Sequence, residues 1–184
     1  MKTPVKTMVS AALLAALTAV CSQIAIPLPW GVPLNLGTLS VFLAGALLGA
    51  KWGFISQLVY VLLGAVGVPV FAGFRGGLDA LTGPTGGYLL GYLLAALLIG
   101  LLVQYRPQKK WMLPLSMACG LAVCYAFGTA WFMILTGTGL LAALAQCVLL
   151  FLPGDAAKIA VASLVVARVG ALRLRQPTQD VPAA

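Results

Sequence analysis

Asp155 and Lys158 are the first candidates for a functional site, because both are charged and both lie in an apolar part of the chain. Their spacing places them on one face of a helix. If that helix begins near Gly154, Asp155 lies in its first turn, where the partial positive charge of the helix N-terminus favours a carboxylate. The pair predicts either a structural ion pair or a polar anchor for a small ligand. In the anchor, the carboxylate accepts N–H groups and the ammonium holds an acceptor or an anion.

Arg75 is a second candidate, because it lies in the glycine-rich run FAGFRGG at residues 71–77 and Asp79 follows it closely. Glycines allow the backbone to approach a ligand or to fold over it. We expect either an ordinary flexible loop with a solvated pair of Arg75 and Asp79, or a lid whose guanidinium meets a substrate carboxylate.

The run GPTGGY at residues 83–88 predicts a turn followed by the start of a helix. Backbone N–H groups at such a start, here near Gly86 and Gly87, suit an anionic group. The run is not a nucleotide-binding loop, because no Gly-Lys-Ser/Thr sequence follows it. An ATP-driven activity would therefore need an ATPase in a different subunit.

The composition shows in which solvent these residues must act. Hydrophobic residues make up 62% of the 184 residues and charged residues only 8%, whereas a soluble domain carries roughly a quarter charged residues. Apolar stretches of about twenty residues, long enough to cross a bilayer as a helix, recur along the chain. The chain is therefore predicted to be an integral membrane protein with the lipid bilayer as its surroundings.

Charge and reactive side chains exclude several functions. The net charge of +8 arises from residues at the ends of apolar segments, so topology and lipid headgroups explain it better than nucleic acid binding does. The four cysteines lie in apolar runs without metal-like or paired spacing, and histidine is absent. We therefore expect no metal site, no cofactor and no nucleic acid partner.

Six hydrophobic segments predict an all-α protein with six transmembrane helices. The second and third are short for full spans, with little but Lys51 between them, and are expected to be tilted or broken. Pro153 and Gly154 interrupt the last apolar stretch, which favours a short helix over 140–152 and a sixth span from near Gly154 over one kinked helix. We expect a membrane domain over 1–172 and a flexible cytoplasmic tail over 173–184. The segments are 7–26, 38–50, 52–66, 83–105, 111–135 and one that ends near Gly170.

Basic residues predict the orientation, because they concentrate on the cytoplasmic side of membrane proteins. Nine of the eleven Lys and Arg residues lie on one side if the N-terminus is cytoplasmic, and the outer connections 27–37, 69–82 and 136–139 contain only Arg75. Both termini are therefore predicted to be cytoplasmic. The nine residues are Lys2, Lys6, Lys51, Arg106, Lys109, Lys110, Arg168, Arg173 and Arg175.

Small residues recur at a spacing of four in the first segment, where Ala12 precedes Ala16 and Ala15 precedes Ala19. Such stripes allow two helices to approach closely. They predict either packing within this protein or a docking face for another membrane subunit.

Aromatic residues fall into two groups. Those at segment ends are interpreted as anchors in the membrane interface. Those within the fifth segment, Tyr125, Phe127 and Trp131, are interpreted mainly as packing residues, of which one could stack on a ligand ring.

Six blocks of sequence carry a resemblance to a known family: ALTAV at 16–20, VPLNLGTL at 32–39, LAGALLG at 43–49, GVPVFAG at 67–73, GPTGGYLLG at 83–91 and PGDAAK at 153–158. In this order and spacing they resemble the BioY family, the biotin-specific substrate components of energy-coupling factor (ECF) transporters. The resemblance covers about residues 8–170. It implies a six-helix subunit of the bacterial cell (inner) membrane that holds biotin near the outer face. The ligand would lie beneath the loops that join helices one to two and three to four.

The resemblance also implies partners and contacts. Such proteins work with a transmembrane coupling subunit and a pair of cytoplasmic ATPases. The stripe on the first segment is similar to the family's alanine motif for contacting the coupling subunit, which favours the docking interpretation of Ala12 and Ala16.

Site residues are implied position by position. Asp155 and Lys158 match the family's Pro-Gly-Asp-x-x-Lys block, whose Asp and Lys reach the biotin head group in relatives. Arg75 and Tyr88 lie in matching blocks and are expected to contact the ligand. The sequence departs from the family at Gly37, where many relatives have glutamine, and Asn35 is the expected substitute.

Biotin matches this set of side chains chemically. Its ureido group offers two N–H donors and a carbonyl, which suit Asp155 beside Lys158. Its valerate carboxylate suits Arg75 or the N–H groups near Gly86 and Gly87. Both orientations of the ligand are open at this point.

Two other classes of function are alternatives to a binding and transport subunit. A membrane enzyme acting on a lipid or isoprenoid would need clustered acids or histidines on the cytoplasmic side, where only Asp180 lies. A solitary carrier driven by an ion gradient would use Asp155 as its proton or sodium site. The sequence therefore predicts a transport protein and not an enzyme.

Overall fold

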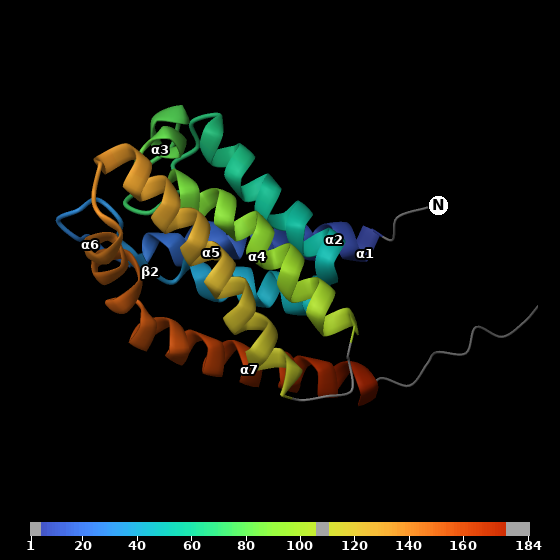
Figure 1. The fold of residues 1–184 in the computed structure, drawn as a ribbon. Helices are drawn as coiled ribbons and strands as arrows, with labels where there is room; N and C mark the ends of the chain where they lie inside the picture. Colours follow the sequence, from blue (N-terminus) through green and yellow to red (C-terminus); the bar gives the residue numbers. More distant parts are fainter. Residues whose placement is uncertain (1–4, 106–110, 176–184) are drawn as a thin grey trace, which may run out of the picture.

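The computed structural model describes residues 5–105 and 111–175, most of which are helical (Figure 1). Two short strands pair antiparallel, with Ala25 opposite Asn35. The long helices are α1 (Val5–Gln23), α2 (Gly37–Ala65), α4 (Gly86–Tyr105), α5 (Met112–Thr136) and α7 (Leu152–Arg175). The short elements are β1 (Ala25–Ile26), β2 (Leu34–Asn35), α3 (Leu78–Thr82), α6 (Leu140–Leu144) and the π-helix η1 (Ala145–Leu149).

Length and apolar composition identify the helices that can cross a membrane. Among the described residues, α1, α2, α4 and α5 each pass this criterion. A fifth crossing results if Leu140–Leu149 and Leu152–Val169, which are bent by 40° at a short break, form one span. The prediction of an all-α, multi-pass membrane protein agrees with this result. In this count of four or five spans, α2 is taken as a single span.

The element α2 contains a break at Gly49, where φ is +78° and ψ is −178°. Such a positive φ is open to glycine but rarely to other residues. A Cβ atom on Gly53 would lie 3.0 Å from the Gly45 Cα atom, although eight residues of continuous helix extend about 12 Å. The two halves of α2 therefore fold back on each other. The break lies at Gly49, two residues before its expected position at Lys51.

The last apolar stretch consists of a short helical region, Leu140–Leu149, and helix α7, with a bend of 40° at the break between them. The break lies between η1 and α7, slightly earlier than the expected start near Gly154. Pro153 falls in the first turn of α7, where the missing N–H group of proline costs no helical hydrogen bond.

Two helix boundaries differ from those expected from the sequence. The first segment was expected to reach Ile26, but α1 ends at Gln23 and Ile26 lies in β1, because the chain must reverse to pair with β2. Helix α7 continues to Arg175, into the predicted tail, and residues 176–184 lie outside the described residues. Four members of the predicted set of cytoplasmic residues also lie outside the described residues, namely Lys2, Arg106, Lys109 and Lys110.

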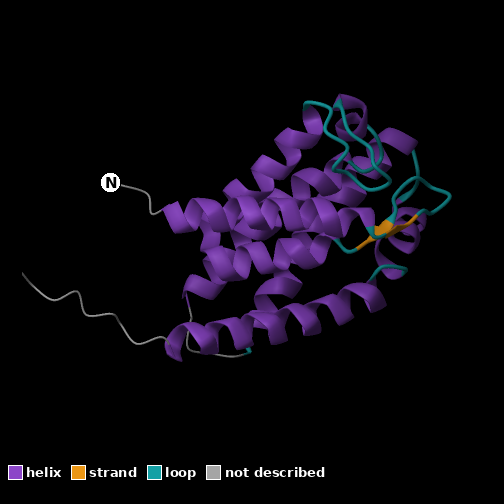
Figure 2. Cartoon of the chain, turned by 180° about the vertical axis from the view of Figure 1, so that it is seen from behind, coloured by secondary structure: helices purple, strands orange, loops and turns teal. Residues whose placement is uncertain are grey.

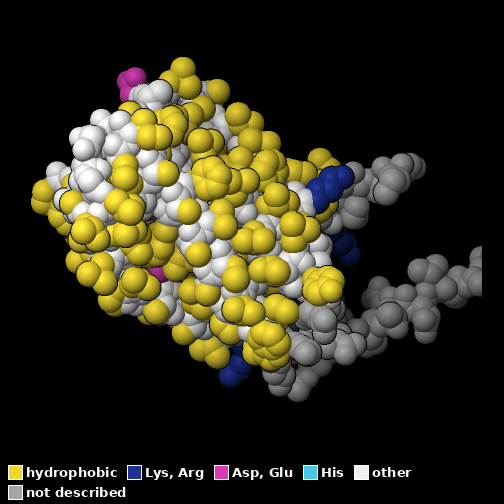
Figure 3. Space-filling model, viewed as in Figure 1, with side chains coloured by type: hydrophobic (Ala, Val, Ile, Leu, Met, Phe, Trp, Pro, Cys, Tyr) yellow, Lys and Arg dark blue, Asp and Glu magenta, His cyan; other side chains and the backbone are white. Residues whose placement is uncertain are grey.

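The connections gather at one end of the bundle, where Figure 2 shows the strands and most of the loops. Helix α1 begins, and α7 ends, at the opposite end (Figure 1). Helix α4 packs against both α2 and α5, and its Ala96 and Ile99 are fully buried. The face seen in Figure 3 is largely apolar, with basic side chains toward the end where α1 begins. The bundle thus leaves one end rich in loops for a polar site.

Candidate functional site

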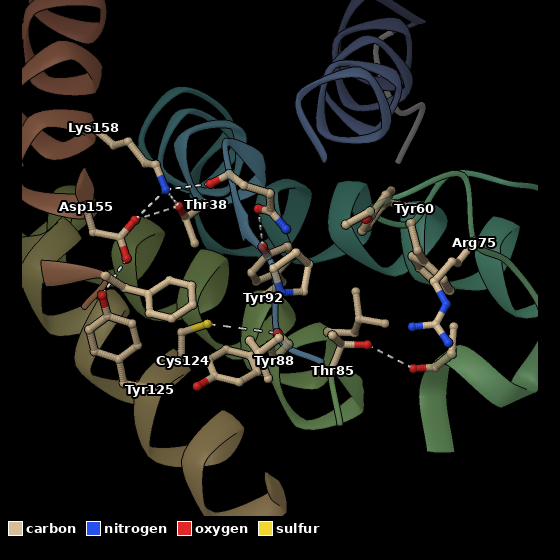
Figure 4. A pocket seen from close by; sticks show the side chains of 18 residues that line it. Thr38, Tyr60, Arg75, Thr85, Tyr88, Tyr92, Cys124, Tyr125, Asp155 and Lys158 are labelled. Carbon is tan, nitrogen blue, oxygen red and sulfur yellow. Dashed lines mark hydrogen bonds and ion pairs between the residues drawn. The ribbon is translucent and has the colours of Figure 1, made fainter. Parts of the chain in front are cut away.

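A pocket lies near the end of the bundle that carries the loops, and it encloses about 730 Å3, including its opening to solvent. Helices α2, α4, α5 and α7 contribute side chains to it, together with the loops before α2 and before α3 (Figure 4). Elements from the whole length of the sequence therefore meet around one cavity.

Asp155 and Lys158 form a buried ion pair at one side of this pocket. The Lys158 Nζ atom lies 2.6 Å from the Asp155 Oδ1 atom, and the two residues are only 8% and 1% exposed. Thr38, in the first turn of α2, donates a hydrogen bond of 3.1 Å to the same carboxylate oxygen. Tyr125 of α5 donates to the other oxygen, Oδ2. Three helices therefore converge on one carboxylate.

Protein acceptors occupy all the donor capacity of Lys158. Besides the carboxylate of Asp155, its ammonium donates to the Asn35 carbonyl oxygen at 2.6 Å and to Thr38 Oγ1 at 3.1 Å. An ammonium has three N–H donors. Lys158 thus fixes the carboxylate in place, whereas Asp155 keeps one acceptor site, on Oδ2, for a further donor.

The side chain of Asn35 is oriented by its own hydrogen bonds. Its Oδ1 atom accepts from the Gly37 N–H group at 2.9 Å and from the Tyr92 hydroxyl at 3.3 Å. In the part of the chain that the structure describes, its Nδ2 atom has no acceptor. Because Asn35 lines the pocket, this nitrogen is a donor available to a ligand.

Arg75 lies across the pocket from Asp155 and Lys158 (Figure 4). It is exposed, and within residues 5–105 and 111–175 no ion pair joins it to Asp79. The solvated pair expected between these two residues is therefore not formed. The guanidinium is available to an anionic group at this side of the pocket.

Aromatic rings form the walls between these two polar ends. Tyr60, Phe71 and Tyr88 contribute rings to the pocket, and the rings of Tyr60 and Phe71 are 5.5 Å apart in an edge-to-face arrangement. The hydroxyl groups of Tyr60 and Tyr88 donate to Ser22 Oγ at 2.9 Å and to the Cys147 carbonyl at 3.2 Å. These tyrosines therefore offer their rings to a ligand.

Gly86 and Gly87 do not belong to the set of pocket-lining residues. Both are buried: Gly86 packs against the Leu81 carbonyl and Gly87 against Trp131, at distances that leave no room for a Cβ atom. The Gly86 N–H group donates to the Gly83 carbonyl at 3.0 Å. The two glycines thus serve close packing at the start of α4.

The stripe of small residues on α1 divides into two faces. Ala15 is 3% exposed and packs with the partly buried Ala19 against the core. Ala12 and Ala16 are exposed on the other face. Of the four alanines in the stripe, Ala12 and Ala16 are therefore the two that are exposed to another subunit.

Thr38 and Tyr92 were not predicted as site residues from the sequence, and Tyr125 was interpreted mainly as a packing residue. A signal existed for Tyr92, because it follows Tyr88 by four residues and so lies on the same helical face. Thr38 and Tyr125 carried no such signal, since their partner Asp155 lies 117 and 30 residues away in the chain.

These features define a class: a helical, multi-pass membrane protein with an internal pocket that is polar at both ends and aromatic between them. A sequence profile of the BioY family matches residues 1–175. The chain therefore belongs to the BioY family.

Individual relatives agree with this assignment. The biotin transporter BioY of Thermotoga maritima is 41% identical over 121 residues, which cover 66% of this chain and 70% of the relative. The biotin transporter BioY of Rhodobacter capsulatus is 38% identical over 164 residues, or 81% of this chain and 84% of the relative. The crystal structure of the S-component for biotin from an ECF-type ABC transporter superposes with a TM-score of 0.86 at 28% identity, covering 93% of this chain and 95% of that one.

Family membership confirms the resemblance found in the sequence. It also confirms that the chain is a transport protein and not an enzyme, because the family is one of transporters.

Proposed function

We propose that this protein is the biotin-binding S component of an ECF-type transporter and mediates biotin uptake. The pocket geometry carries the proposal, because a buried carboxylate and an exposed guanidinium lie on opposite sides of an aromatic cavity. Biotin is complementary to this arrangement, because its ureido ring offers N–H donors at one end and its carboxylate is an anion at the other. Relatives named as biotin transporters support this ligand.

The ureido ring of biotin would lie at Asp155. That carboxylate retains one acceptor site, on Oδ2, for a ligand N–H donor, while Lys158 has no spare donor. The Asn35 Nδ2 atom is available to the ureido carbonyl oxygen, because Asn35 Oδ1 is already used. Asp155 and Asn35 are thus the direct contacts, and Lys158, Thr38 and Tyr125 hold Asp155 in place.

The valerate carboxylate would lie at Arg75. A guanidinium recognises a carboxylate through paired N–H donors, and this guanidinium has no carboxylate partner in the described residues. Tyr88 and the other aromatic rings would contact the apolar part of the ligand. In this orientation the N–H groups of Gly86 and Gly87, which do not line the pocket, would not bind the carboxylate.

The chain would cross the membrane six times, with both termini in the cytoplasm. Counting the two halves of α2 separately and the bent pair as one span gives six crossings. The end with Lys6, Lys51 and Arg168 would face the cytoplasm, since basic residues concentrate there. The pocket would then open toward the outer face of the bacterial inner membrane.

A coupling subunit and cytoplasmic ATPases would energise transport. The exposed Ala12 and Ala16 of α1 supply the face on which another membrane helix can approach closely. The structural relative is itself an S-component of an ECF-type ABC transporter, which supports partners of this kind.

Calorimetric titration of biotin into the purified protein tests the proposal, with thiamine as the control ligand. We expect tight one-to-one binding of biotin and no heat from thiamine. Absence of biotin binding by a folded protein would contradict the proposal. ATP depletion that abolishes uptake in cells, where an uncoupler does not, would further separate this function from that of a solitary ion-driven carrier.

A further inference from the structure

The turn over residues 71–75, which carries Arg75, is closed by backbone hydrogen bonds. The Phe71 N–H group donates to the Arg75 carbonyl at 2.9 Å, and the Arg75 N–H group donates to the Phe71 carbonyl at 3.2 Å. Phe74 has a φ of +58°, which residues other than glycine rarely adopt. Its side chain is 72% exposed. Side-chain packing therefore does not hold the tip of this turn.

The base of the turn, by contrast, is packed firmly. The Phe71 ring is only 4% exposed and lies edge-to-face with Tyr60. It also fills the space above Gly64, where a Cβ atom would overlap the ring. The turn is thus anchored on α2 at one side, and its tip needs another contact.

Gln23, the last residue of α1, makes that contact. Its Oε1 atom accepts a hydrogen bond of 2.9 Å from the Phe74 N–H group. Its Nε2 atom donates to the Phe71 carbonyl at 3.1 Å and to the Pro69 carbonyl at 3.4 Å. A side-chain amide can do both because it carries a donor and an acceptor. Gln23 therefore joins the base of the turn to its strained tip.

We propose that Gln23 is a positioning residue, which holds the 71–75 turn so that Arg75 faces the ligand carboxylate. Arg75 directly follows Phe74, so the backbone conformation that Gln23 stabilises sets the direction of the guanidinium. Gln23 itself does not line the pocket with Asp155 and Lys158. The inference rests on the proposed function, since it assigns the carboxylate of biotin to Arg75.

The test compares biotin with biotin methyl ester, which lacks the carboxylate charge, in wild-type protein and in Gln23→Ala. We expect Gln23→Ala to weaken biotin binding about fivefold, through faster dissociation, as for the loss of one or two hydrogen bonds. The affinity for the ester should change little. Gln23→Met, which keeps the side-chain length without the amide, should behave in the same way.

A mutant cycle with Arg75→Ala separates positioning from general stability. The double variant should bind biotin as Arg75→Ala alone does, because Gln23 acts through Arg75. Thr136→Val removes a side-chain hydrogen bond to a carbonyl at the end of α5, that of Phe132, and should leave binding unchanged.

Each outcome is decisive for one of the two proposals. Equal loss of affinity for both ligands, full additivity with Arg75→Ala, or unchanged biotin affinity in Gln23→Ala would overturn the positioning role. Failure of the wild-type protein to bind biotin would contradict the proposed function instead.

Discussion

The two polar ends of the pocket differ in how the protein supports them. Asp155 and Lys158 are buried, come from one helix and are held by hydrogen bonds from α2, β2 and α5. Arg75 is exposed and lies on a turn attached through backbone hydrogen bonds and Gln23. A buried ion pair is strongly coupled to folding, whereas an exposed charge contributes little to stability. The first end is therefore held by buried contacts, and the second depends on the hydrogen bonds of one exposed turn.

The largest expected effect is on folding at the buried end. Lys158→Met leaves the Asp155 carboxylate buried without its partner, and we expect the free energy of unfolding to fall by about 3–5 kcal/mol. Denaturant unfolding in detergent measures this loss. The double variant Asp155→Leu with Lys158→Met should recover much of it, and failure to do so would show that the pair is not the cause.

The next largest effect is on biotin binding by Asp155→Asn. The amide keeps the size but loses the charge that accepts a ureido N–H group, so we expect affinity to fall about a hundredfold, or about 2.7 kcal/mol. Calorimetry on a folded variant measures it. Asp79→Asn, a change at an exposed residue of α3 that does not line the pocket, should bind as the wild type does. A loss below tenfold in Asp155→Asn would exclude its assigned contact.

Arg75→Ala should have a smaller effect, which depends on the ligand. We expect biotin affinity to fall about tenfold, as for a charge-assisted hydrogen bond, with little change for the methyl ester. The wild-type affinity should also decrease at high salt, because the charge is exposed. Arg168→Ala, an exposed arginine on α7, is the control. Equal losses for both ligands would place the carboxylate elsewhere.

The smallest effect is expected for Tyr125→Phe. The change removes one hydrogen bond to Asp155 Oδ2 but keeps the ring, so biotin affinity should fall about fivefold, or about 1 kcal/mol. Titration calorimetry measures this difference as well. An affinity equal to that of the wild type would mean that Thr38 and Lys158 suffice to orient the carboxylate.

The difference between the two ends of the pocket also explains which features could be predicted from the sequence. Asp155 and Lys158 were predictable because a charge in an apolar stretch is costly and so stands out. The long apolar helices were predictable for a similar reason, since composition and length define them. The break in α2 was also predictable, because the apolar segments 38–50 and 52–66 are each short for a full span.

Contacts between distant segments were not predictable in this way. Thr38 and the Asn35 carbonyl reach Lys158 from 120 and 123 residues away, and only folding brings them together. Gly86 and Gly87 looked like ligand contacts in sequence, yet Leu81 and Trp131 occupy the space around them. A glycine that permits close packing and one that faces a ligand have the same local sequence.

A structure of the protein with bound biotin tests the central claim most directly. We predict that the ureido ring lies within hydrogen-bonding distance of the Asp155 carboxylate and the Asn35 side-chain nitrogen, with the valerate carboxylate at Arg75. The reverse orientation, or biotin bound outside this pocket, would contradict the account.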